Sequence, residues 1–126
     1  MDDLRQWLNK AGELGELKKI EGADWDLEIG TIGALNVKKS RPSALLHDNI
    51  KDYLPGYRLL NCAMSTQQRV ALTLNLPLSH SDMELLVLLR EKLKEWTANS
   101  DKFPPQKVTT GTVLENVHSC DDINVL

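Results

Sequence analysis

Cysteine is scarce in this sequence, and the scarcity excludes a class of small proteins. Two cysteines, Cys62 and Cys120, occur among 126 residues and stand far apart. A disulfide-stabilised fold or a structural zinc site needs more thiols at closer spacing. Cys62 lies in an apolar run whose nearest cationic residue is Arg58, so a nucleophilic role has little support. We expect two buried thiols.

Long apolar runs and an excess of basic residues are also missing. The longest nearly uncharged apolar stretch covers residues 85–89, far too short to cross a bilayer. The acidic start at residues 1–3 lacks the basic region of a signal peptide. A formal net charge of −3 does not draw a chain to phosphate backbones or anionic lipid. We therefore expect a cytoplasmic protein that binds neither nucleic acid nor membranes.

Motifs for nucleotides and metals are absent from the sequence as well. The glycines do not form a G-x-G-x-x-G or G-x-x-x-x-G-K-[ST] pattern. The three histidines, His47, His80 and His118, are dozens of residues apart and lack a second histidine at metal-ligand spacing. We therefore assign no catalytic, cofactor-binding or metal-binding residue to this chain.

A few titratable groups remain as weak candidates for chemistry. His47 precedes Asp48 at a predicted strand end, where an imidazole beside a carboxylate can titrate near neutrality, but a surface histidine in a turn explains it equally well. The carboxylate pair Asp24/Asp26 suits the start of a helix, and the pair Asp121/Asp122 suits a turn. Sequence does not show the environment that acid–base catalysis requires.

The length and the apolar pattern predict a single α/β (or α+β) domain over residues 1–126. A chain of this size buries about two-thirds of its unfolded surface. We expect roughly four helices on a small mixed sheet. Three helices are predicted near residues 3–12, 24–38 and 65–76, with Asp2 or Asp3 capping the first. A capping box over residues 65–68 is predicted to start the third. The four strands are predicted at residues 17–20, 44–47, 57–62 and 108–117.

The strongest local signal begins the fourth helix. Ser81 and Glu84 have the spacing of a capping box, in which each side chain bonds the other residue's backbone N–H. An apolar stripe follows the box, formed by Leu85, Leu86, Leu88, Leu89, Leu93 and Trp96. Because the stripe spans only about two heptads, packing on the same domain is a better interpretation than a coiled coil with a partner helix.

Seven blocks of sequence, taken in order, resemble the N-terminal segment of UbiD-type decarboxylases. The blocks are DLRQWL (3–8), ELGELKKI (13–20), DLEI (26–29), PSALLHDNIKDY (42–53), RLLNCAMSTQQRVA (58–71), GTVLENV (111–117) and DDINVL (121–126). The last two look like the linker by which these enzymes enter their cofactor-binding domain. His47 departs from the pattern, where an aromatic residue such as phenylalanine is expected.

The resemblance implies a carboxy-lyase of aromatic, heteroaromatic or α,β-unsaturated acids that uses prenylated FMN, with Mn²⁺ and K⁺ at the cofactor's phosphate. In that family the catalytic residues and metal ligands lie in a later split-barrel domain. None of those positions exists in this chain. The resemblance therefore implies a structural N-terminal domain that is inactive alone. Its partners would be the remaining domains of the enzyme, and the full enzyme could form a homo-oligomer.

Two other functions stay open. The chain could be a stand-alone adaptor or assembly subunit that docks on a separate catalytic chain, although the apolar ending at residues 122–126 favours truncation of a longer protein. An independent ligand-binding module would need a pocket with convergent polar groups, which the sequence does not reveal.

Overall fold

The computed structural model describes residues 3–78 and 81–115 and divides the chain into two compact units, residues 1–91 and 92–126. The first unit contains a three-stranded sheet of order β1-β2-β3, formed by β1 (Leu17–Glu21), β2 (Ala44–Asp48) and β3 (Leu59–Asn61). β1 and β2 are parallel, whereas β2 and β3 are antiparallel. The predicted small mixed sheet is confirmed, with three of its four strands.

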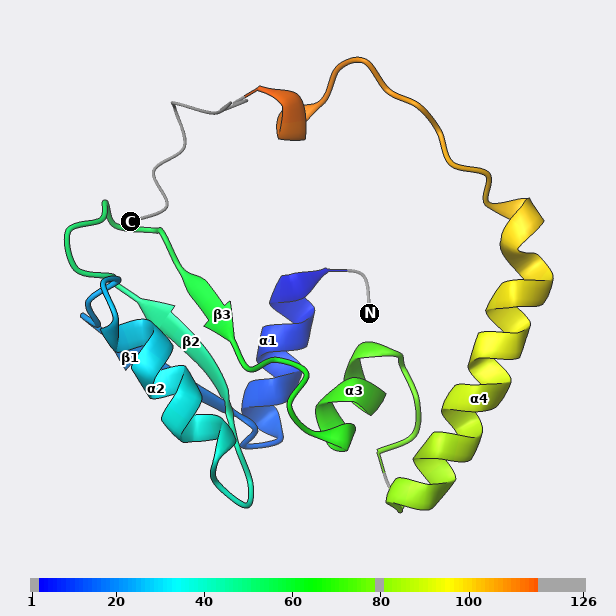
Figure 1. The fold of residues 1–126 in the computed structure, drawn as a ribbon, viewed down its shortest axis with the longest axis horizontal. Coiled ribbons are helices and arrows are strands. Elements are labelled where there is room, and N and C mark those ends of the chain that lie inside the picture. Colours follow the sequence, from blue (N-terminus) through cyan, green and yellow to red (C-terminus); the bar gives the residue numbers. More distant parts are fainter. Residues whose placement is uncertain (1–2, 79–80, 116–126) are drawn as a thin grey trace. The chain divides into compact units, whose positions relative to one another are not determined.

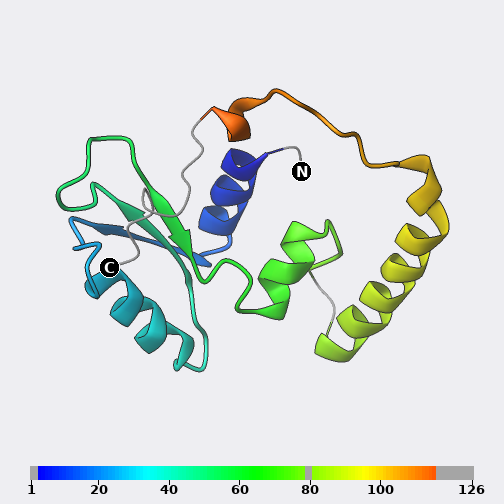
Figure 2. The same cartoon turned by 45° about the horizontal axis from the view of Figure 1, so that its top comes forward.

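Three helices accompany the sheet: α1 (Leu4–Glu13), α2 (Glu28–Val37) and α3 (Gln67–Thr73). α2 is the crossover that two parallel neighbours require, because a tight turn cannot join them. Figures 1 and 2 show α1 and α2 on opposite sides of the sheet. The core therefore has two parts, one beneath α1 and α3 and one beneath α2.

The part beneath α1 and α3 is centred on Trp7 and Ala11 of α1, which pack with Ala44 of β2 and Leu72 of α3. The Trp7 indole N–H also donates to the Thr73 hydroxyl at 2.9 Å. The Asp3 side chain accepts from the Gln6 N–H at 2.8 Å, which confirms Asp3 as the cap of α1. The contacts on this side of the sheet thus join α1 to α3, which are far apart in the sequence.

The part beneath α2 contains Ala23, Ile29 and Ile50, with Ile20 and Ile32 packed against them. α2 approaches β3 closely at one point. A Cβ atom added to Gly33 would lie 2.5 Å from Nδ2 of Asn61, far inside van der Waals contact. Glycine is therefore required at this position unless the Asn61 side chain moves.

The fourth helix, α4 (Asp82–Asn99), begins in the first unit and ends in the second. The Ser81 N–H donates to the Glu84 carboxylate at 2.8 Å, and the Glu84 N–H donates to the Ser81 hydroxyl at 3.5 Å. The predicted capping box is confirmed. The box predicted over residues 65–68 is displaced by one position, because Thr66 is the residue that caps α3.

The second unit, as far as it is described, contains the end of α4 and two short 3₁₀ helices, Ser100–Lys102 and Thr112–Leu114. The strand predicted at residues 108–117 is wrong over its described part, because residues 108–115 contain no strand. β-branched residues favour a strand only where a neighbouring strand is available to pair with. Residues 116–117, His80, His118, Cys120, the Asp121/Asp122 pair and residues 122–126 lie outside the described residues.

Candidate functional site

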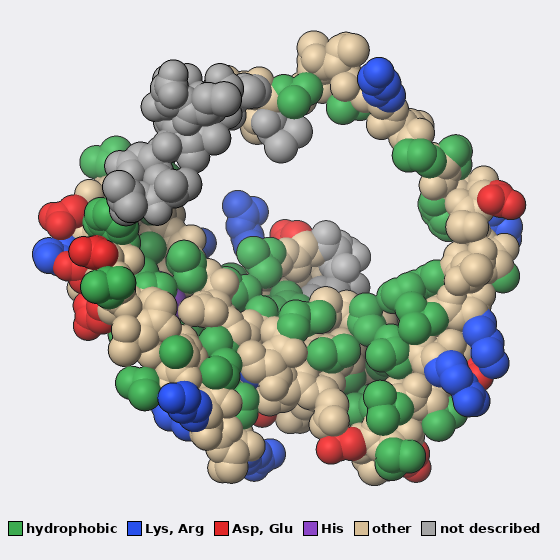
Figure 3. All heavy atoms as spheres, in the orientation of Figure 1, with side chains coloured by type: hydrophobic (Ala, Val, Ile, Leu, Met, Phe, Trp, Pro, Cys, Tyr) green, Lys and Arg blue, Asp and Glu red, His purple; other side chains and the backbone are tan. Residues whose placement is uncertain are grey.

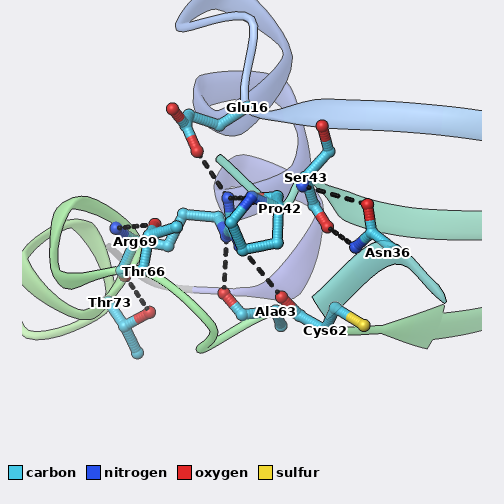
Figure 4. Close-up of polar contacts among 9 residues, drawn as sticks. All are labelled: Glu16, Asn36, Pro42, Ser43, Cys62, Ala63, Thr66, Arg69 and Thr73. Carbon is cyan, nitrogen blue, oxygen red and sulfur yellow. Dashed lines mark hydrogen bonds and ion pairs between the residues drawn. The ribbon is translucent and has the colours of Figure 1, made fainter. Parts of the chain in front are cut away.

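Arg69 of α3 is a fully enclosed polar side chain of the first unit, with 0% exposure. Its guanidinium donates to the carbonyl oxygens of Ala63 at 3.0 Å, Pro42 at 2.8 Å and Cys62 at 3.2 Å, and forms an ion pair with Glu16. Figure 4 shows these acceptors arranged around the guanidinium. Three sequence segments, at Glu16, Pro42 and residues 62–63, therefore converge on one side chain.

The acceptors of Arg69 all come from places where strands begin or end. Glu16 directly precedes β1, Pro42 lies two residues before β2, and Cys62 and Ala63 follow β3. Carbonyl groups at such positions lack ladder partners and must be satisfied in another way. The planar guanidinium, with five donors in a fixed fork, supplies several bonds at once. Arg69 is thus a structural cross-link, with four of its five N–H donors bonded to protein acceptors.

His47 is the second enclosed polar group, at 0% exposure in the middle of the unit. Neither ring nitrogen has a hydrogen-bond partner. Burial lowers the pKa of His47, while the charge of Glu28 acts weakly in the opposite direction. The interpretation as a surface histidine in a turn is wrong. A neutral imidazole without partners suits an apolar core more than acid–base catalysis, which needs a hydrogen-bonded path to a substrate.

The other sequence candidates are scattered. Cys62 is half-buried, with a backbone φ of +58°, and its thiol contacts the Gly33 carbonyl at 3.9 Å, so it is less enclosed than the expected core thiol. Asp24 and Asp26 precede α2, as predicted for a helix start, and the ammonium of Lys51 holds the pKa of Asp24 below its usual range. Among residues 3–78 and 81–115, no three acidic, histidine or cysteine side chains converge as a metal site would require.

The surface of the first unit carries a groove between α3 and the beginning of α4. Its volume is about 200 Å³, and Figure 3 shows hydrophobic side chains gathered over these two elements. The lining residues come from both helices and the turn after α3: Gln67, Val70, Ala71, Leu76, Asp82, Leu85, Leu86 and Leu89. A second apolar hollow, of about 330 Å³, is lined by Met83, Glu84, Val87 and Leu88 of α4.

The apolar residues along the start of α4 are largely uncovered. Met83 is 71% exposed, Leu86 54% and Val87 50%, whereas Leu85 is buried at 8%. The expectation that the stripe packs on its own domain is therefore wrong for Leu86. Leu93 and Trp96 of the same stripe belong to the second unit. Adjoining exposed apolar side chains of this kind mark interaction surfaces.

A family comparison and a sequence comparison both relate this chain to carboxy-lyases. Residues 6–89 match the family described as the N-terminal domain of 3-octaprenyl-4-hydroxybenzoate carboxy-lyase, UbiD. The chain is 28% identical over 123 residues to the pyrrole-2-carboxylic acid decarboxylase of Pseudomonas aeruginosa. That alignment covers 91% of this chain and 24% of the relative. The chain thus spans about a quarter of the length of that enzyme.

Solved structures show the same fold. The vanillic acid decarboxylase of Sedimentibacter hydroxybenzoicus, in an open form with one truncated component, aligns with a TM-score of 0.62 at 23% identity, over 82% of this chain and 21% of that one. A second open form aligns with a TM-score of 0.65 at 22% identity, over 72% of this chain and 19% of that one. At such identities the similarity establishes the fold alone.

None of the described helices is both long enough and apolar enough to cross a membrane. The expected cytoplasmic location stays a prediction. Neither the burial of Arg69 nor the groove was predicted from the sequence. A signal for Arg69 was available, since a lone arginine precedes the apolar residues Val70, Ala71 and Leu72.

Proposed function

Because the chain belongs to the UbiD N-terminal domain family, we propose that it is the N-terminal structural domain of a larger UbiD-type carboxy-lyase and has no decarboxylase activity alone. The observation that carries this proposal is the match of residues 6–89 to the domain, within a chain that covers only 24% of a relative decarboxylase. The remaining polypeptide of such an enzyme would carry out the decarboxylation.

The chemistry of the described residues supports this assignment. Four N–H donors of Arg69 bond structural acceptors, and His47 is enclosed without a polar partner. Among the described residues no cluster provides the ligands that Mn²⁺ needs, so these residues do not fit the metal. We therefore propose that prenylated FMN, Mn²⁺ and K⁺ bind to the remaining polypeptide.

The domain's own contribution would be to cover and orient the catalytic part. The relatives act, by their names, on pyrrole-2-carboxylic acid and vanillic acid, both of them aromatic acids. We propose that the complete enzyme acts on an acid of the same chemical class. Positioning by a rigid neighbouring domain affects catalysis because small displacements of a bound substrate lower its rate of reaction.

The test starts with the purified 126-residue chain. We expect no flavin absorbance, and no release of carbon dioxide from pyrrole-2-carboxylic or vanillic acid after incubation with prenylated FMN and Mn²⁺. The catalytic polypeptide of the same enzyme, expressed without residues 1–126, should bind the chain and release carbon dioxide faster in its presence. Stoichiometric flavin binding by the chain alone, or failure of the two polypeptides to associate, would contradict the proposal.

The gene sequence, together with the association experiment, separates a domain from an adaptor. If the gene encodes the catalytic part in the same reading frame, the chain is a domain of one polypeptide. If a separate gene encodes the catalytic part and the two products associate, the chain is the adaptor or assembly subunit instead.

A further inference from the structure

We infer that the groove between α3 and α4 is the surface through which this domain docks on the catalytic part of the carboxy-lyase. The inference rests on the proposed function and adds the place of contact. The groove is lined by apolar side chains of both helices, among them Val70 and Leu86. An exposed apolar groove costs free energy in water, and covering it with a complementary apolar surface recovers that free energy.

The position of the groove in the sequence favours this occupant. The family match ends at residue 89, inside α4, and Leu89 is one of the lining residues. The relatives are four to five times longer than their aligned part, since this chain covers 24% and 21% of them. Most of each relative therefore lies outside the matched domain.

The charges at the end of the groove narrow the chemistry of the partner. With its amide nitrogen turned toward α4, Gln67 donates to both carboxylate oxygens of Asp82, at 2.6 and 2.9 Å. Glu84 belongs to the same first turn of α4, bonds Ser81 and does not line the groove. An apolar floor with an acidic end disfavours nucleic acid and anionic lipid. It fits an apolar protein segment that carries a lysine or arginine near Asp82.

The position of Leu86 on α4 allows a substitution that tests the docking groove specifically. Leu86 lines the groove and is 54% exposed, so Leu86→Glu should leave the fold intact while placing a charge in the proposed interface. Leu35 of α2 provides the matched control, because it is also a helical leucine, is 58% exposed and lies outside the groove. Circular dichroism and urea unfolding check that both variants remain folded. Leu86→Ala is a milder second variant that introduces no charge.

The probe is the catalytic polypeptide of the same enzyme, expressed without residues 1–126, and titration calorimetry measures its binding to each form of the chain. We expect Leu86→Glu to weaken binding at least about 30-fold and Leu86→Ala by roughly 3- to 10-fold, whereas Leu35→Glu changes it less than about twofold. In hydrogen exchange, the amides of α3 and of residues 85–91 should slow at least about tenfold on complex formation, as burial in an interface predicts.

The possible results separate this inference from the proposed function. If the unaltered chain binds the probe but Leu86→Glu and Leu35→Glu weaken binding equally, the groove is not the docking surface and the domain assignment stands. If the unaltered chain does not bind, the proposed function fails and the inference fails with it. If the isolated chain sediments as a dimer that Leu86→Glu dissociates, while binding of the probe is unchanged, the groove joins two copies and the inference is overturned.

Discussion

The surroundings of the sheet and the beginning of α4 distribute polar and apolar side chains in opposite ways. Around the sheet, the charged Arg69 is fully buried and meets its acceptors inside the protein. Along α4, the apolar Met83 and Leu86 are 71% and 54% exposed. The difference is that the sheet region supplies partners for its buried charged side chain, whereas the start of α4 leaves apolar side chains uncovered.

The largest effect should come from breaking the arginine cross-link. Arg69→Met keeps an unbranched apolar stem but leaves Glu16 and three carbonyl groups without their donor. Removing one partner of a buried ion pair costs about 3–5 kcal/mol, because the remaining groups stay desolvated. We expect this loss in the free energy of unfolding, measured by urea titration of the chain. Arg41→Met, at an exposed arginine, should change it by less than about 0.5 kcal/mol.

Equal effects of the two arginine substitutions would show that the sheet region does not depend on its buried polar contacts. The distinction between the two regions would then fail. Arg69→Lys refines the test, since an ammonium retains the charge but cannot reproduce the planar fork of donors. Its stability should fall between those of the unaltered chain and Arg69→Met.

The second prediction concerns the buried polar group of the sheet region that lacks partners. In His47→Phe, the two unsatisfied ring nitrogens are removed and replaced by apolar atoms in an apolar site. We expect the free energy of unfolding to rise by about 1 kcal/mol at pH 7, since a buried polar group without a hydrogen bond costs on the order of 1–3 kcal/mol. A loss of stability would mean that the larger ring does not fit the site.

The pH dependence of His47 gives an independent check. Its folded-state pKa lies below the ordinary histidine pKa of about 6.5, because burial disfavours the charged form. Below that value the unfolded chain takes up a proton that the folded chain resists, so stability falls as the pH falls from about 6.5 toward the folded pKa. His47→Phe should have a flatter stability profile over this range. Parallel profiles for the two proteins would show that His47 is not the group responsible.

Features that depend on neighbouring residues in the sequence were predicted better than features that need a distant partner. Asp3 and Ser81 were identified as helix caps because capping depends on side chains within three or four residues. The strands at β1, β2 and β3 were found because short apolar runs between turn residues are local signals. The strand predicted at residues 108–117 failed because a strand also needs a partner, which local composition does not supply.

Features that depend on tertiary contacts were missed for the same reason. Arg69 meets carbonyl groups of Pro42 and Cys62, which are 27 and 7 residues away in the sequence. No spacing rule connects these positions. His47 was placed correctly at the end of a strand, but its burial depends on how the sheet is covered on both sides. The groove likewise exists only because α3 and α4 come together in the first unit.

The smallest effect is expected for Leu86→Ala in α4, where Leu85 and Leu86 are adjacent but differ in burial. Leu85 is 8% exposed and Leu86 is 54% exposed. Leu85→Ala should lower the free energy of unfolding by about 2 kcal/mol, as truncation of a buried leucine does. Leu86→Ala should change it by less than about 0.5 kcal/mol, because its side chain buries little in the isolated chain and alanine favours the helix. Urea titration of both variants measures the contrast, and a loss at Leu86 as large as that at Leu85 would mean that the isolated chain already covers the groove.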